Sequence, residues 1–134
     1  MSPGGKQRSE VAAAGAPAAV GPYSQAIRFG DLLFCSGQIP IDPATGELVE
    51  GTVGQQAERC LGNLEAVCRE AGTSLDHALR MTVYTTRLDQ FPEINEVWAR
   101  RFRSGVQPAR AALGVDRLPM GAEVEIDAIV ACDV

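Results

Sequence analysis

An arginine and a glutamate near the end of the chain have the side chains best suited to chemistry. Arg110 lies among small residues in the segment PARAA, residues 108–112, and its planar guanidinium could hold a carboxylate through two parallel hydrogen bonds. Glu125 lies in residues 123–130, EVEIDAIV, where its carboxylate falls on the face opposite the apolar residues and is of a type that could take part in proton transfer. The pattern alone also fits a surface arginine, an ion pair between Arg110 and Glu125, or a solvated Glu125.

Four further residues could contribute to a binding site, each on a weaker signal. The ring of Tyr23 is placed by the preceding turn, residues 21–22, and such a tyrosine is usually partly buried packing. Asn95 adjoins apolar helix positions and is more often a surface amide than a ligand. Ser36 and Gly37 end a predicted strand, where their backbone N–H groups could bind an anion.

The elements that must position these residues follow from hydrophobic periodicity. The predicted strands cover residues 26–29, 32–36, 79–86, 109–115 and 123–132. An amphipathic helix follows Thr52, which forms a capping box with Gln55, and ends at Gly72. A second helix starts at Asp89 and ends before Gly105. The order β-β-α-β-α-β-β predicts an α+β fold with two helices on one face of a mixed sheet.

The last predicted strand separates its residues between two faces, because side chains alternate along a strand. Its apolar members should point to the core, and these are Val124, Ile126, Ala128 and Val130. Glu123, Glu125 and Asp127 should share the opposite face. A domain this small could cover that second sheet face by forming an oligomer.

Chain length indicates one domain. The 134 residues fit a single domain over residues 18–134 after a flexible leader over residues 1–17, and residues 37–51 read as a long loop.

Composition and charge argue against several classes of function. The net charge of −5 argues against nucleic-acid binding. The four cysteines form no CxxC pair and lie outside metal-ligand spacing of the single histidine, so we expect no metal site. No apolar run is long enough for a membrane helix, and we expect a cytoplasmic protein without a membrane partner.

Three ordered blocks of this sequence resemble the Rid family, also called YjgF or L-PSP. They are residues 18–25 (AAVGPYSQ), residues 36–40 (SGQIP) and residues 108–129, which include PAR, RLP and VEIDAI. The resemblance implies a chorismate-mutase-like fold and a homotrimer with its sites in clefts between subunits. It also implies hydrolytic deamination of 2-aminoacrylate and 2-aminocrotonate, or their imine tautomers, to 2-keto acids and ammonia, without a metal or cofactor.

The resemblance also assigns roles to the candidate residues. Arg110 would grip the substrate carboxylate and Glu125 would activate water, and we expect them to converge on one small pocket from neighbouring strands. Tyr23 and Asn95 would line that pocket, and the backbone near Ser36 and Gly37 would shape its carboxylate site.

Three positions depart from the common family pattern. Ala112 stands at a substrate-binding position that is often cysteine, Gln107 stands where phenylalanine is common, and Met120 stands where lysine is common. The loss of the thiol argues against thiol chemistry at Ala112, and a changed pocket mouth could alter substrate preference.

Two other functions remain open from the sequence. The same arginine could serve a non-catalytic trimer that senses 2-keto acids or amino acids. Some relatives are described as ribonucleases or translation inhibitors, but the predicted pI of about 4.8 and the lack of a basic, aromatic stripe argue against action on RNA.

Overall fold

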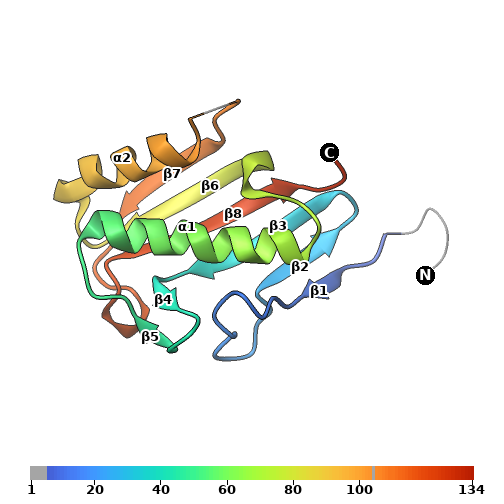
Figure 1. The fold of residues 1–134 in the computed structure, drawn as a ribbon, viewed down its shortest axis with the longest axis horizontal. Helices are drawn as coiled ribbons and strands as arrows, with labels where there is room; N and C mark the ends of the chain where they lie inside the picture. Colours follow the sequence, from blue (N-terminus) through green and yellow to red (C-terminus); the bar gives the residue numbers. More distant parts are fainter. Residues whose placement is uncertain (1–5, 104) are drawn as a thin grey trace.

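A six-stranded mixed sheet with both α-helices on one face forms the body of the protein (Figure 1). The computed structural model describes residues 6–103 and 105–134. The strands of this sheet are β1 (Ser9–Val11), β2 (Ala26–Phe29), β3 (Leu32–Gln38), β6 (Ala78–Thr85), β7 (Ala109–Gly114) and β8 (Val124–Ala131). Their spatial order is β1-β2-β3-β8-β6-β7, and within the described residues β6 and β7 are the parallel pair. The predicted fold class is confirmed.

The first helix, α1 (Val53–Glu70), begins at the predicted capping box. The Thr52 side chain accepts from the Gln55 backbone N–H, and the Gln55 side chain accepts from the Thr52 N–H. Gly72, just beyond the helix end, has φ +82°, the left-handed conformation that glycine adopts at low cost. The second helix, α2 (Phe91–Arg101), starts later than predicted, because Leu88–Gln90 form a 3₁₀ turn first.

The core lies between the helices and the sheet. In β8 the residues predicted to face the core, from Val124 to Val130 in steps of two, are all buried. The alternate residues of the strand, including Glu125, face away from the helices. The predicted alternation is therefore confirmed within β8. The prediction that Glu123 shares the face of Glu125 is wrong, because Glu123 precedes the strand and its carboxylate accepts from the Gln56 side chain of α1 at 2.9 Å.

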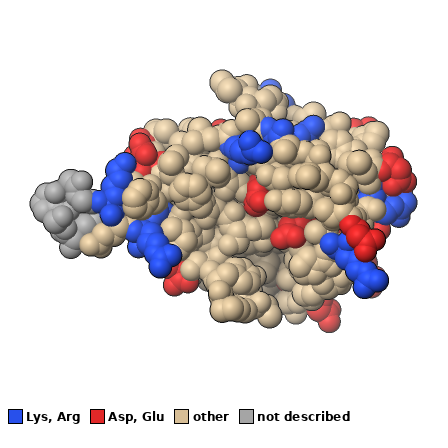
Figure 2. Space-filling view, turned by 180° about the vertical axis from the view of Figure 1, so that it is seen from behind, with Lys and Arg blue, Asp and Glu red and all other residues tan. Residues whose placement is uncertain are grey.

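The second face of the sheet carries no helix and is open (Figure 2). It is largely uncharged, with a few acidic groups near its middle. Phe34 on β3 and Leu113 on β7 keep 42% and 45% of their surface exposed. Exposed large apolar side chains on one face are typical of a surface that another chain covers.

The N-terminal segment differs from the flexible leader that the sequence predicted. Residues 1–5 lie outside the described part of the chain, but Ser9–Val11 pair with β2 as strand β1. The buried Gln25 side chain bonds to the Ala13 N–H and carbonyl and to the Pro17 carbonyl at 2.7 Å. These bonds hold a stretch rich in Ala, Gly and Pro, whose composition alone predicts no order.

The loop predicted over residues 37–51 contains a small hairpin, formed by β4 (Ile41–Asp42) and β5 (Glu47–Leu48). The fully buried Asn63 of α1 supports it by donating to the carbonyls of Ile41 and Ile39, at 2.9 and 3.4 Å. No helix in the described part of the chain is long and apolar enough to cross a membrane.

Replacing Asn63 tests this support. Asn63→Ala leaves the two carbonyls without their buried donor, and we expect it to lower the free energy of unfolding by about 1–3 kcal/mol. Urea denaturation would measure the change. Glu58→Ala, at an exposed position of the same helix, serves as the control and should stay within about 0.5 kcal/mol of wild type. Equal stability of the two variants would contradict this role of Asn63.

Candidate functional site

A cavity on the open side of the sheet contains Glu125 together with three of the other predicted site residues. Its volume is about 460 Å³, and Tyr23, Ser36 and Gly37 line it with Glu125. A shift in register between Cys35 and Gln38 lets β3 bulge beside β8 at this point. Sequence motifs far apart in the chain therefore meet at one cavity.

Close packing against Gly37 fixes the position of the Glu125 side chain. A Cβ atom added to Gly37 would collide with Glu125 Oε2 and lie only 3.0 Å from Cδ. A larger residue here would displace the Glu125 carboxylate, so the constraint at Gly37 comes from space rather than from its backbone angle. The predicted role of Gly37 in shaping the site therefore has a steric basis.

The environment of Glu125 changes its acidity. Partial burial raises the pKa of the Glu125 carboxyl above its ordinary value, and the nearby Asp127 carboxylate raises it further. Asp127 is itself held, since it accepts from the Thr82 N–H at 3.2 Å and from the Tyr84 hydroxyl at 3.1 Å. A carboxylate with a raised pKa is a stronger base than an ordinary glutamate.

Ser36 and Tyr23 have defined positions in the cavity wall. The Ser36 hydroxyl donates to the Ser24 carbonyl at 2.6 Å, and the Ser36 N–H donates to the Gln25 carbonyl at 2.9 Å. The expectation that the Ser36 N–H binds an anion is therefore wrong, because that N–H already has a partner. Tyr23 keeps 52% of its surface exposed, so it can contact a ligand.

Arg110 lies elsewhere, between the edge strand β7 and helix α2. The centre of its guanidinium group is 5.1 Å from the centre of the Phe91 ring and 5.0 Å from that of Trp98. Stacking on aromatic rings orients a guanidinium while its N–H edge stays available for hydrogen bonds. Among residues 6–103 and 105–134 the ion pairs within 4 Å do not include Arg110. The ion pair with Glu125 that the sequence left open is not formed.

The remaining two candidates share the location of Arg110. Ala112 follows Arg110 by two residues on β7 and therefore points to the same face. Asn95 is exposed and lies one helical turn from both Phe91 and Trp98 on α2. The predicted site residues thus divide into two groups, which we call the Glu125 half-site (Tyr23, Ser36, Gly37, Glu125) and the Arg110 half-site (Asn95, Arg110, Ala112).

The two half-sites lie on opposite sides of the sheet within one chain. Arg110 is in register with Met81 of β6, which is fully buried under the helices. Glu125 is paired with Tyr84 on the other face of β6. The expectation that Arg110 and Glu125 converge from neighbouring strands is therefore wrong for a single chain, because β6 separates β7 from β8.

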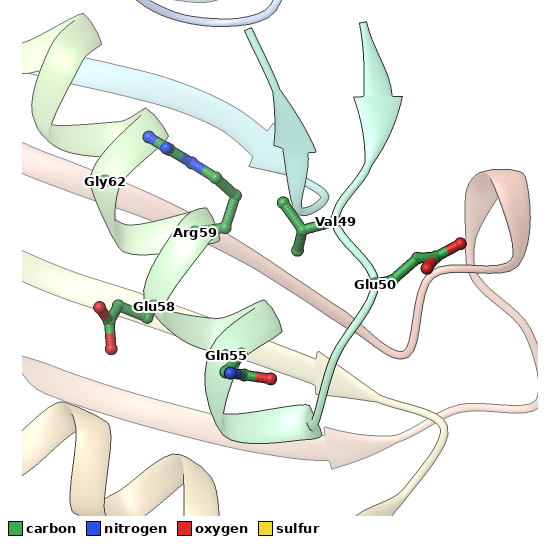
Figure 3. Close-up of a pocket in the computed structure, with 6 residues that line it drawn as sticks. All are labelled: Val49, Glu50, Gln55, Glu58, Arg59 and Gly62. Atoms are coloured by element: carbon green, nitrogen blue, oxygen red, sulfur yellow. The ribbon is translucent and has the colours of Figure 1, made fainter. Parts of the chain in front are cut away.

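A second hollow, beside α1, is a weaker candidate (Figure 3). It is lined by Val49, Glu50, Gln55, Glu58, Arg59 and Gly62. Gln55 is used in the helix cap, and Arg59 donates to Asn63 at 3.1 Å. The labelled carboxylates point away from one another and from the arginine, so the hollow gathers no set of reactive groups.

Comparison with known proteins identifies the family of the chain. Residues 13–132 match the family described as endoribonuclease L-PSP. The chain belongs to this family, known also as Rid.

Two curated relatives and one solved structure illustrate the similarity. The RutC family protein y4sK of Sinorhizobium fredii is 55% identical over 115 residues, covering 86% of this chain and 90% of the relative. The 2-iminobutanoate/2-iminopropanoate deaminase of Bos taurus is 40% identical over 122 residues, covering 91% and 88%. A Rid-family protein of unknown function, YyfA from Yersinia pestis, superposes with a TM-score of 0.91 at 41% identity, covering 93% of this chain and 99% of that one.

Sequence reasoning missed the apolar wall that this Rid-family cavity presents to a ligand. Pro17, Ala18 and Val20 contribute from the N-terminal segment, and Met120 contributes from the turn before β8. The first three belong to a stretch expected to be leader or turn. The departure at Met120 from the family pattern was a usable signal, but only the fold places Met120 beside Glu125.

The raised pKa of Glu125 predicts how its neighbours affect titration. Asp127→Asn removes the nearby negative charge, so the pKa of Glu125 should fall toward its ordinary value. A pH titration followed by carboxyl carbon NMR would measure this. Asp89→Asn, on an exposed side chain in the 3₁₀ turn, is the matched control. An unchanged Glu125 titration in Asp127→Asn would contradict the assigned coupling.

The same pKa shift predicts a stability effect. A carboxyl whose pKa is raised by folding stabilises the fold at low pH, and that contribution is lost as pH rises through the raised value. Glu125→Gln cannot ionise, so it should be more stable than wild type at neutral pH and lose that advantage below the ordinary glutamate pKa. Thermal unfolding across this pH range would reveal the difference, and a pH-independent difference would oppose it.

Proposed function

We propose that this Rid-family chain hydrolyses small 2-imino acids, or their enamine tautomers, to 2-keto acids and ammonia. We further propose that two copies of the chain form each site, as in a homotrimer. The observation that carries the proposal is the presence of two complementary half-sites that cannot meet within one chain. The bovine relative, 40% identical, bears the name of this activity.

The half-sites supply the groups that the reaction needs. Arg110 of one copy would bind the substrate carboxylate through its exposed N–H edge. Glu125 of the neighbouring copy would take a proton from water as the water oxygen bonds to the imine carbon. That step converts the C=N double bond to a single bond and gives a tetrahedral carbinolamine. Starting from the protonated imine, this addition leaves a neutral amine, to which Glu125 returns its proton. Glu125 then takes the hydroxyl proton as the keto C=O bond forms and the C–N bond breaks, so the nitrogen leaves as ammonia and Glu125 passes its proton to water or to the ammonia.

The surfaces around the half-sites support assembly. The described residues place β7 at the edge of the sheet, so one side of its backbone is open to pairing or packing. The open face beside it carries the exposed Phe34 and Leu113. In a ring of identical copies, one surface of each subunit meets a different surface of the next. That arrangement can bring the Arg110 half-site of one copy to the Glu125 half-site of another.

Mixing two inactive variants tests the shared site directly. Arg110→Ala and Glu125→Gln should each lose at least about a hundredfold in kcat/KM, as loss of a binding arginine or a general base does. When the two are refolded together, an Arg110→Ala copy still supplies Glu125 and a Glu125→Gln copy still supplies Arg110. About a quarter of the interfaces in a random mixture should then be intact, with activity to match. Keto-acid release from an imine generated in situ is the measurement.

The control for mixing is each variant refolded with itself, which should stay inactive. Wild-type activity in Arg110→Ala alone would remove the arginine from the mechanism. Wild-type activity in Glu125→Gln alone would likewise remove Glu125 as the general base. Failure of the mixture to regain activity, with mixed oligomers present by mass spectrometry, would exclude a site shared in this way.

A glycine substitution tests the packing of the base. Gly37→Ala places a methyl group where the Glu125 carboxylate lies, so Glu125 must turn away and turnover should fall at least about tenfold. Gly54→Ala is the matched control, because a Cβ there meets only ordinary contacts at 3.6 Å and sits in a helix. Steady-state kinetics of both variants would decide. Full activity in Gly37→Ala would show that the close approach is unimportant.

Binding without turnover would point to a sensor instead. If the wild-type protein binds a 2-keto acid in calorimetry but does not speed imine hydrolysis, the Arg110 half-site serves recognition only. That result would refute the catalytic part of the proposal and leave the shared site to be judged by binding in the mixed variants.

A further inference from the structure

The cavity beside Glu125 is larger and more apolar than the smallest imino acids require. Its volume of about 460 Å³ lies in the range of roughly 300–1,000 Å³ that accommodates ligands of drug size. Glu125 is the one ionisable carboxyl group among the described residues that line it. Most of the remaining wall away from the strand bulge is aliphatic.

Two separate segments form the aliphatic wall. Pro17, Ala18 and Val20 come from the N-terminal segment, and Pro119 and Met120 come from the turn before β8. Val20 and Met120 keep 81% and 62% of their surface exposed. Apolar side chains exposed at a cavity gain free energy when an apolar ligand group covers them.

The N-terminal part of the wall is held in place before any ligand binds. The buried Gln25 amide donates to the carbonyls of Ala13 and Pro17. The Ser24 hydroxyl donates to the carboxylate of Glu10, a residue of strand β1, at 2.9 Å. A preformed wall lowers the entropy cost of binding a ligand against it.

The backbone conformation at Met120 is unfavourable for a methionine. Its φ of 59° and ψ of 15° lie in the left-handed region, which is uncommon for residues other than Gly, Asn and Asp. Met120 pays a backbone cost at this position, and its side chain lies at the cavity, where lysine is common in the family. A flexible thioether at a pocket mouth adapts to apolar ligand groups of different shape.

We infer that Met120, facing the N-terminal wall, selects 2-imino acids that carry extended apolar side chains, such as those formed from leucine or methionine, over three-carbon imino acids. The inference deepens the proposed function and rests on it. The carboxylate and imine carbon of the substrate lie between Arg110 and Glu125, and the substrate side chain lies along the aliphatic wall. Met120 is thus a specificity-determining residue of the Glu125 half-site.

The test compares two imines, formed in situ from leucine and from alanine by an amino-acid oxidase. The wild-type kcat/KM for the leucine-derived imine should exceed that for the alanine-derived imine by about tenfold or more, since each added methylene gains binding in an apolar pocket. Met120→Asn keeps the left-handed backbone and replaces the thioether with an amide, so the ratio should fall by about tenfold. Met120→Leu, which stays apolar, should retain most of the ratio.

Two further variants distinguish a contribution of the aliphatic wall from the effect of replacing any exposed apolar side chain with a polar one. Val20→Ser should lower the ratio in the same direction as Met120→Asn. Val106→Asn removes an apolar side chain that is 90% exposed and does not line the cavity, so it should leave the ratio unchanged. Light scattering should give the same assembly for every variant.

The outcomes distinguish this inference from the proposed function. A wild-type preference for the alanine-derived imine, or a ratio unchanged in both Met120→Asn and Val20→Ser, overturns the inference while the deaminase activity stands. Equal loss on both imines, together with weakened assembly, overturns it by showing that a second copy covers Met120. If no imine is hydrolysed, calorimetry with 4-methyl-2-oxopentanoate and pyruvate still tests whether Met120 favours ligands with extended apolar side chains. Tighter binding of the former that depends on Met120 supports the inference, and equal binding overturns it.

Discussion

The pairing of β6 with β7 on one side and β8 on the other is the constraint on which the candidate site depends. Met81 of β6 is buried under the helices, and its partner Arg110 must point to the same side. Tyr84 of β6 points to the open side together with its partner Glu125. A slip of one residue in either register would reverse the face of that partner. With both registers as they are, the Glu125 carboxylate and the Arg110 guanidinium of one chain lie on opposite sides of the sheet and cannot contact the same small ligand.

This separation prevents Glu125 and Arg110 of one chain from forming an ion pair and neutralising each other. Partial burial and the neighbouring Asp127 disfavour the charged form of Glu125. Arg110 gains stabilisation from Phe91 and Trp98 on a scale of about 0.5–2 kcal/mol. If the two formed an ion pair within the chain, the pKa of Glu125 would fall and the guanidinium would have less capacity for a ligand. A substrate with a carboxylate and a protonated imine would instead complement both half-sites at once.

The sequence predicted those parts of the fold that depend on local pattern. The alternation from Val124 to Val130 and the capping box of Thr52 and Gln55 were correct because each depends on neighbouring residues alone. The order β1-β2-β3-β8-β6-β7 depends on long-range pairing that no local pattern encodes. For that reason the sequence placed Arg110 and Glu125 on neighbouring strands, whereas β6 lies between them. Their roles as site residues stay predictions. The order of the N-terminal segment was missed because it comes from a single buried side chain, Gln25.

Several departures from ordinary structural preference occur around the Glu125 cavity. Every fully buried side-chain nitrogen or oxygen atom in the described residues has a hydrogen-bond partner, and α1 begins at a capping box. Around the Glu125 cavity a carboxylate is partly desolvated, Met120 adopts a left-handed backbone, and Val20 and Met120 expose apolar surface. Each of these features costs folding free energy, and proteins retain such costs mainly where function requires them. The hollow beside α1 shows no comparable departure, because its polar groups serve the helix cap and the support of the β4–β5 hairpin. Together with the residues that line it, these features favour the Glu125 cavity over the hollow beside α1 as a surface that binds a ligand.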